Sequence, residues 1–149
     1  MRMFQMTLVA SLLLAGTSFA DTINVPDDYS TIQEAVDAAN DGDEIIVGPG
    51  TYSDGNQNEV VKMGGKAVWL HSSDGPETTI IDGSGARRGI ACVLGEGLGT
   101  VIEGFTIRNC DDGPGKGVGG GILVASDSSP TIRDCHVINS DAWWGGGIG

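Results

Sequence analysis

Basic residues are scarce in this chain. Only 8 lysines and arginines stand against 20 aspartates and glutamates, which gives a formal net charge of −12. A surface of this sign repels phosphate backbones and anionic membranes, so the composition argues against nucleic acid as a partner. It would also repel polyanionic sugars unless calcium bridged them. The plainer interpretation of the acidity is that it keeps an exported protein soluble.

Long hydrophobic runs are also missing. The apolar stretch Leu8–Ala15 is too short to span a bilayer, and no later segment approaches the ~18 apolar residues that spanning needs. With Arg2 before it and the small-x-small sequence Ser18–Ala20 after it, this stretch predicts a signal peptide over residues 1–20. We therefore expect an extracytoplasmic chain that is secreted, periplasmic or at the cell surface. No cysteine lies just after the expected cleavage point to carry a lipid anchor.

Cysteine is rare and odd in number, with Cys92, Cys110 and Cys135. Cysteines of an exported chain often pair, but an odd count leaves at least one thiol free. In the repeat described below, the three fall in different columns, opposite Val124, Ser140 and Phe105 respectively. Such positions are poorly placed for a disulfide. We predict free, mostly buried thiols that pack as small apolar side chains.

Helical periodicity is confined to one short segment near the start. After a short extended piece at Thr22–Val25, Ser30 is the expected N-cap, with Gln33 completing a capping box. The apolar residues that follow share one face of a helix, and they are Ile32, Ala35, Val36 and Ala39. Residues 40–42 end the helix. We interpret residues 21–43 as an N-terminal cap that covers the end of a larger structure.

From Glu44 onward, short apolar runs alternate with clusters of turn-forming residues. This pattern predicts strands at 45–47, 60–63, 68–71, 79–82, 90–94, 101–108, 122–125 and 131–139. The two longest runs each contain an expected bend, at Gly104 and at Asp134.

The last third of the chain repeats itself. Residues 101–109 align with residues 131–139, thirty positions later, whereas the Gly-Gly-Gly-Ile of 119–122 returns at 145–148, only twenty-six positions later. A strand pattern that stays in register while one loop changes length is typical of a solenoid, because each coil stacks on its neighbour and the loops project freely. Residues 44–149 are therefore predicted to form stacked coils.

The alignment also predicts which side chains face inward. The expected inward columns are Ile102 with Ile132, Phe105 with Cys135, Ile107 with Val137, and Ile122 with Ile148. Asn109 and Asn139 should stack at a bend, where asparagine tolerates left-handed backbone and its amide can hydrogen-bond from coil to coil.

Several motifs resemble the pectin lyase-like superfamily of right-handed parallel β-helices. They are Thr31-Ile-Gln-Glu-Ala-Val-Asp-Ala-Ala39, the segments 42–52 and 79–83, and Glu103-Gly-Phe-Thr-Ile-Arg-Asn109. The resemblance implies an all-β, right-handed parallel β-helix with a short N-terminal capping helix. The glycine runs after Asn109 and Asn139 are partly similar to repeats of polymorphic outer-membrane proteins. A shared scaffold does not transmit an activity.

The chain ends at Gly149 within its second Gly-Gly-Gly-Ile unit, without a polar closing segment. A solenoid needs a cap over its last core layer, so we expect a piece of a longer protein, truncated at the C-terminal end, with the remaining coils as its immediate partner. The function we expect is an exported scaffold that binds a polysaccharide or cell-surface glycan or mediates adhesion. The alternative is a polysaccharide-degrading enzyme, similar to pectate lyases, polygalacturonases or pectin methylesterases, whose active site lies in missing coils.

Candidate carbohydrate-binding residues lie in two loops of the last third. Trp143 and Trp144 have no obvious inward column, and their rings could stack on sugars or simply cover the edge of a coil. Asp111 and Asp112 follow the Asn109 bend. They could contribute to a glycosidase carboxylate pair or to a calcium site, although adjacent turn residues usually diverge and calcium wants six or more oxygens. A solvated turn is the simpler interpretation.

Other motifs are absent or uninformative. The polygalacturonase pattern is missing apart from the bare Asp pair, and the pectate lyase arginine motif and pectin methylesterase aspartates are not found. Gly115–Gly120 formally matches G-x-G-x-x-G, but its flanks are not the strand and helix that a dinucleotide site requires. The side chains His71, His136, Arg87 and Arg88 show no spacing that predicts a triad or a metal set. The sequence therefore predicts neither a catalytic residue nor a metal ligand, and no cofactor is evident.

Overall fold

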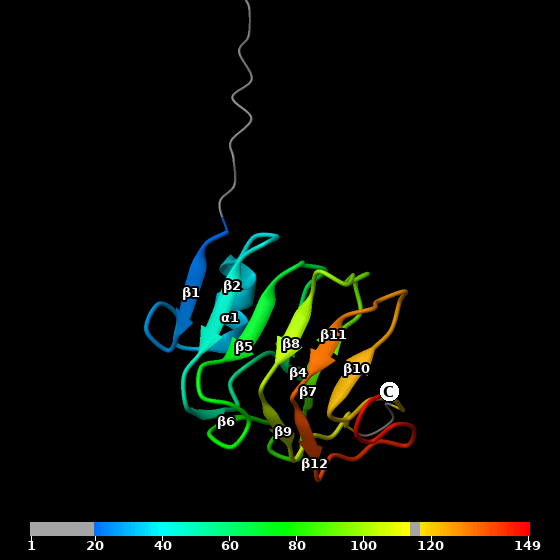
Figure 1. The fold of residues 1–149 in the computed structure, drawn as a ribbon. Coiled ribbons are helices and arrows are strands. Elements are labelled where there is room, and N and C mark those ends of the chain that lie inside the picture. Colours follow the sequence, from blue (N-terminus) through cyan, green and yellow to red (C-terminus); the bar gives the residue numbers. More distant parts are fainter. Residues whose placement is uncertain (1–19, 114–116) are drawn as a thin grey trace, which may run out of the picture.

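The computed structural model of the chain describes residues 20–113 and 117–149. The expected signal peptide therefore lies, apart from Ala20, outside the described residues. The rest forms a parallel β-solenoid of about three turns (Figure 1). Its strands belong to three parallel sheets, with the orders β1-β2-β5-β8-β11, β4-β7-β10 and β3-β6-β9-β12.

Strands of the same sheet come from successive coils. The first sheet contains β1 (Thr22–Val25), β2 (Glu44–Val47), β5 (Trp69–Ser72), β8 (Val101–Glu103) and β11 (Thr131–Arg133). The second contains β4 (Glu59–Lys62), β7 (Arg88–Cys92) and β10 (Ile122–Val124). The third contains β3 (Gly50–Tyr52), β6 (Thr79–Asp82), β9 (Thr106–Arg108) and β12 (His136–Ile138). The strand pattern missed β3, because its Gly-Thr-Tyr carries no apolar run.

The expected helix is present as α1 (Ile32–Ala38), but its start differs from the prediction. Its N-cap is Thr31, whose hydroxyl accepts the N–H of Glu34 at 3.1 Å while the Glu34 carboxylate accepts the N–H of Thr31 at 3.1 Å. Both Ser30/Gln33 and Thr31/Glu34 have capping-box spacing, and the second pair prevails because a carboxylate is favoured at the positive end of a helix. The prediction of Ser30 and Gln33 as the capping pair was wrong.

Gln33 has a different role, which is to join the helix to the second sheet. Its side-chain oxygen accepts the N–H of Lys62 at 2.7 Å and its amide donates to the Lys62 carbonyl at 3.2 Å. At the other end of α1, the Lys66 ammonium donates to three carbonyls, those of Val36, Asp37 and Ala39, at 2.7 Å each. A cation in this place satisfies carbonyls that have no partner within the helix.

The predicted apolar stripe of α1 is buried, with Ile32, Ala35, Val36 and Ala39 all exposed by 3% or less. The helix contacts β1, β2 and β4, so it covers the first coil, as its narrow apolar face predicted. Among the described residues, no helix is long and apolar enough to cross a membrane.

The predicted register of the repeat is confirmed, but the predicted inward position of Ile148 is wrong, because its side chain is 53% exposed and does not belong to the core. Ile102 pairs with Ile132, Ile107 with Val137, and Ile122 with Ile148. Gly104 and Asp134, with φ of 79° and 51°, divide the two long strand predictions into β8 and β9 and into β11 and β12.

Asn109 and Asn139 adopt the predicted left-handed backbone, with φ of 50° and 48°. The Asn109 amide makes a coil-to-coil hydrogen bond to the carboxylate of Asp82, at 3.1 Å.

The interior is a single apolar column, and the cysteines belong to it. Cys92 and Cys110 are buried, Cys135 is half-buried, and all three are free thiols. Burial, with the nearby Glu96 charge, raises the pKa of Cys92 to about 12, so its thiol is inert at neutral pH. The cysteines pack as the small apolar side chains that the sequence predicted.

Candidate functional site

The structure brings three of the four predicted site residues into one cleft. The cleft measures about 260 Å³ and is lined by Asp111, Asp112, Gly113, Asp141, Ala142 and Trp143. These residues follow the two stacked bends at Asn109 and Asn139, after β9 and β12. Asp141 was not among the predicted site residues, and the signal for it in the sequence is its place thirty residues after Asp111, one coil length of the strand repeat.

Coil stacking sets the position of the carboxylates. Asp111 and Asp141 form a parallel bridge, so they occupy equivalent places in neighbouring coils. The N–H of Asp141 donates to the carbonyl of Cys110 at 2.8 Å, and the N–H of Asp111 donates to the carbonyl of Arg87 at 3.0 Å. Both aspartates are therefore held by backbone contacts that do not depend on their side chains.

Asp111 and Asp112 line the same cleft but differ in environment. Asp111 is half-buried, and its carboxylate accepts the N–H of Gly113 at 2.8 Å. Asp112 has a side chain only 3% exposed, and its Oδ2 lies 3.8 Å from Nη2 of Arg88. That oxygen has no hydrogen-bond partner among the described residues. The simple solvated turn expected from sequence is therefore wrong for Asp112.

Arg88 is held in place by the neighbouring coil. Its Nε donates to the carbonyls of Val118 and Gly119 at 3.2 and 3.1 Å. These bonds keep the guanidinium beside Asp112 but beyond hydrogen-bond length from it. The Arg88 charge partly offsets that of Asp112 without satisfying its oxygen.

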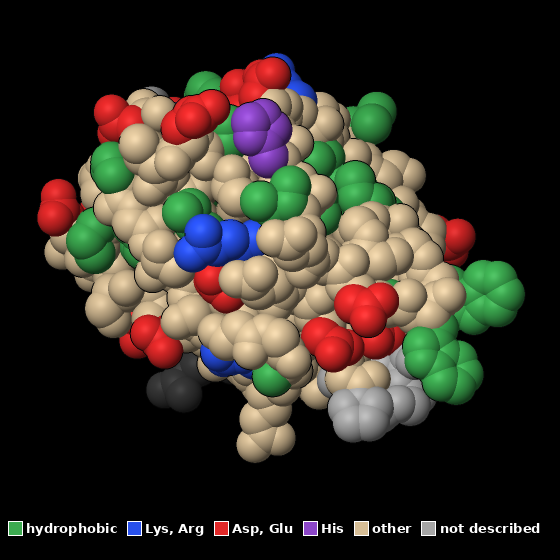
Figure 2. Space-filling model, turned by 90° about the horizontal axis from the view of Figure 1, so that it is seen from below, with side chains coloured by type: hydrophobic (Ala, Val, Ile, Leu, Met, Phe, Trp, Pro, Cys, Tyr) green, Lys and Arg blue, Asp and Glu red, His purple; other side chains and the backbone are tan. Residues whose placement is uncertain are grey.

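The two tryptophans have different positions. Trp143 is 83% exposed and lines the cleft. Trp144 is 72% exposed, forms a bridge with Val118, and is not among the described residues that line the cleft. Figure 2 shows acidic side chains gathered near large hydrophobic side chains at one edge of the face seen from below. The structure thus separates two residues that the sequence placed together.

The glycine run at 119–121 has a packing explanation. A Cβ on Gly120 would collide with the backbone carbonyl of Asp141, and one on Gly121 would collide with Val137. Gly119 and Gly145 occupy equivalent positions with φ of 65° and 62°. These glycines permit the close approach of coils that brings Asp141 toward Asp111. Part of the G-x-G-x-x-G match, at 115–116, lies outside the described residues.

The cleft combines an open aromatic ring with carboxylate oxygens. An indole face supplies apolar contact for the C–H face of a sugar ring, and carboxylates accept hydrogen bonds from its hydroxyls. Among the described residues, no group of three or more His, Cys, Asp or Glu side chains is arranged to hold a metal ion.

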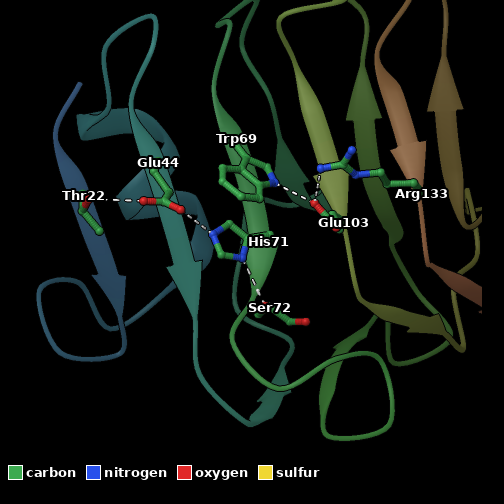
Figure 3. A network of polar contacts seen from close by, with 7 residues as sticks. All are labelled: Thr22, Glu44, Trp69, His71, Ser72, Glu103 and Arg133. Atoms are coloured by element: carbon green, nitrogen blue, oxygen red, sulfur yellow. Dashed lines mark hydrogen bonds and ion pairs between the residues drawn. The ribbon is translucent and has the colours of Figure 1, made fainter. Parts of the chain in front are cut away.

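A second polar cluster lies on the outer face of the first sheet (Figure 3). His71 Nε2 is 2.9 Å from the Glu44 carboxylate, and the rings of His71 and Trp69 stack with centroids 4.2 Å apart. The indole of Trp69 and the guanidinium of Arg133 both donate to Oε2 of Glu103, at 2.9 and 2.7 Å.

This cluster links neighbouring strands of the first sheet. The hydrogen bond from Arg133, with smaller help from Trp69, holds the pKa of Glu103 below its ordinary value. Its contacts join β1, β2, β5, β8 and β11, because the Thr22 hydroxyl also donates to the Glu44 carboxylate at 3.3 Å. The His71–Glu44 and Trp69–Glu103 contacts are diagonal, since the register places Glu44 opposite Trp69 and His71 opposite Glu103. No local spacing connects His71 with its partner, since Glu44 lies 27 residues away in the sequence. The strand register alone does not identify this pair, because it places Glu44 opposite Trp69 and His71 opposite Ile46.

Comparison with known protein families found no matching family model, and comparisons with curated proteins and with solved structures found no significant match. The parallel β-solenoid is therefore established by the structure itself, and membership of the pectin lyase-like superfamily stays a prediction.

Proposed function

We propose that this chain is an exported carbohydrate-binding scaffold, which binds a glycan in the cleft between the loops after β9 and β12. The observation that carries the proposal is the pairing of the open Trp143 ring with the carboxylates of Asp111 and Asp141 in one concave site. Ligand sites generally join an apolar surface to a few placed polar groups in this way. The loops of a rigid scaffold are also where binding residues concentrate.

Further support comes from the sequence. The signal-like N-terminus favours a place where glycans are abundant, and the motifs at 31–39 and 103–109 favour a right-handed coil related to the pectin lyase-like superfamily. Nearly all parallel strand crossovers are right-handed, which agrees with that choice. Adhesion would follow if the bound glycan belongs to another cell surface.

The test is a glycan array followed by titration calorimetry on the best ligand. We expect Trp143→Ala to weaken binding at least about tenfold, which corresponds to ~1.4 kcal/mol, a contribution on the scale of the buried apolar face of one ring. Trp144→Ala is the matched control, since Trp144 is equally large and exposed but does not line the cleft, and it should change the affinity less than about twofold.

Unchanged thermal melting of both variants would show that the fold is intact. If no glycan binds the full chain, or if the two tryptophan variants lose affinity equally, the proposal is wrong.

A further inference from the structure

The cleft concentrates negative charge that its own residues do not neutralise. Asp111 and Asp141 occupy equivalent positions in adjacent coils, and neighbouring strands of a parallel ladder lie about 4.8 Å apart. Like charges placed opposite each other across a ladder destabilise it. Asp112 adds a third carboxylate to the same lining.

Asp112 points to a missing hydrogen-bond donor. Its side chain is 3% exposed, and its Oδ2 has no hydrogen-bond partner among the described residues. A buried carboxylate oxygen without a donor is costly, and such a group in a native protein calls for an explanation. The nearest cation is Arg88, whose Nη2 lies 3.8 Å from Oδ2 of Asp112. The Nε of Arg88 donates to two backbone carbonyls instead.

A ligand that carries both a hydrogen-bond donor and a positive charge would satisfy the Asp112 oxygen and reduce the repulsion between the carboxylates. An ammonium group carries three N–H donors and one positive charge in a compact volume. A neutral sugar hydroxyl could donate to the carboxylates but would leave their mutual repulsion in place. A uronic acid would add to that repulsion, and the net charge of −12 would oppose its approach.

We propose that the cleft selects sugars that carry a free amino group, with the sugar ring on Trp143 and the ammonium directed to Asp111, Asp112 and Asp141. The inference rests on the proposed carbohydrate binding and narrows it to amino sugars. It also accounts for the Trp143 ring, which is 83% exposed in the cleft lining.

The test compares the affinities of three probes for the full chain, measured by titration calorimetry. They are a glucosamine hexamer, its fully N-acetylated counterpart and a galacturonic acid hexamer, at low ionic strength and a pH at which the free amines are protonated. We expect the glucosamine hexamer to bind at least about tenfold more tightly than the acetylated hexamer, and the galacturonate not to bind. This preference should shrink as salt is added, because screening weakens charge pairing at an open site.

Variants connect the preference to the cleft. Asp141→Asn changes an exposed side chain, so it should keep the fold and reduce the preference for the free amine several-fold. Asp112→Asn should reduce the preference for the free amine further. If this substitution of a buried residue impairs folding, the result for Asp141→Asn decides the test. Asp54→Asn, an exposed carboxylate away from the cleft, is the control and should leave the preference unchanged.

The outcomes separate the two proposals. The amino-sugar inference is overturned if the glucosamine hexamer and its N-acetylated counterpart bind equally, or if the preference for the free amine is unchanged in Asp141→Asn. Carbohydrate binding stands in either case. If none of these probes nor any arrayed glycan binds, both fall.

Discussion

At the scale of single residues, the position of Asp112 depends on Arg88. Arg88 is the first residue of β7, and Asp112 follows the bend at Asn109. Their side chains are only 12% and 3% exposed, respectively. Losing one member of a buried pair leaves an uncompensated charge, which costs far more than losing an exposed pair. Arg88 also satisfies the carbonyls of Val118 and Gly119.

We expect Arg88→Met to lower the free energy of unfolding by about 3–5 kcal/mol. Arg133→Met is the control, because Arg133 pairs with Glu103 from a side chain that is 53% exposed, and it should cost about 0–1 kcal/mol. Urea denaturation followed by circular dichroism measures both. Equal losses would contradict the assignment of Arg88 as the counterion that keeps Asp112 in place.

At the scale of elements, loops from three successive coils are joined by one carboxylate. Glu96, between β7 and β8, is fully buried. It accepts hydrogen bonds from the N–H groups of Gly65 and Leu94, at 2.8 and 2.9 Å, and from the hydroxyl of Ser128 at 2.8 Å. Burial disfavours its charged form, but these donors outweigh burial and hold the pKa of Glu96 below its ordinary value of 4.5.

Glu96→Gln should therefore destabilise the chain at neutral pH and change its response to acid. A group whose pKa is lowered by folding contributes stability that is present above its unfolded value, here 4.5, and that is lost as the pH falls through the lower folded value. We expect the variant to lose about 1–3 kcal/mol at pH 7 and the gap to wild type to narrow below pH 4.5.

The measurement is denaturant unfolding as a function of pH, with Glu77→Gln, an exposed glutamate, as control. A gap between wild type and Glu96→Gln that is constant with pH would show that Glu96 does not carry this charge-dependent stability.

The elements themselves show what local pattern can predict. The apolar stripe of α1 and the bends at Gly104 and Asp134 were correct, because each depends on neighbours within one helical turn or on one backbone conformation. The helix start was displaced by one residue, since two overlapping capping boxes compete there. β3 was missed because Gly50–Tyr52 becomes a strand only by pairing with β6.

At the scale of the whole molecule, Asp21, just before β1, is hydrogen-bonded to the start of the first coil. The backbone nitrogen of Asp21 donates to Oδ1 of Asp43 at 2.9 Å, and Oδ2 of Asp43 accepts the N–H of Asn40 at 2.7 Å. The bonds from Asn40 and Asp21 hold the pKa of Asp43 below its ordinary value. Cleavage of the expected signal peptide after Ala20 would turn the Asp21 nitrogen into an ammonium facing this carboxylate.

We expect the exported chain to begin at Asp21 and to gain stability from its free N-terminus. Mass spectrometry of the secreted protein tests the first point, and a different start would contradict it. For the second, a chain beginning at Asp21 should unfold at a higher temperature than the same chain acetylated at its N-terminus, by the equivalent of about 0.5–1 kcal/mol. Equal melting temperatures would show that the terminal charge contributes nothing.

The sequence alone determined the coil repeat, the inward columns apart from Ile148, and the capping helix, because these follow from spacings within a strand, a turn or one coil length. It also identified Asp111, Asp112 and the two tryptophans as candidate binding residues in two loops. Only the tertiary structure separated Trp143 from Trp144, added Asp141 and paired Asp112 with Arg88. The contacts of Asp141 with Asp111 and of Asp112 with Arg88 join different coils, and the two tryptophans differ in the direction of neighbouring side chains; both depend on loop paths that no local pattern encodes.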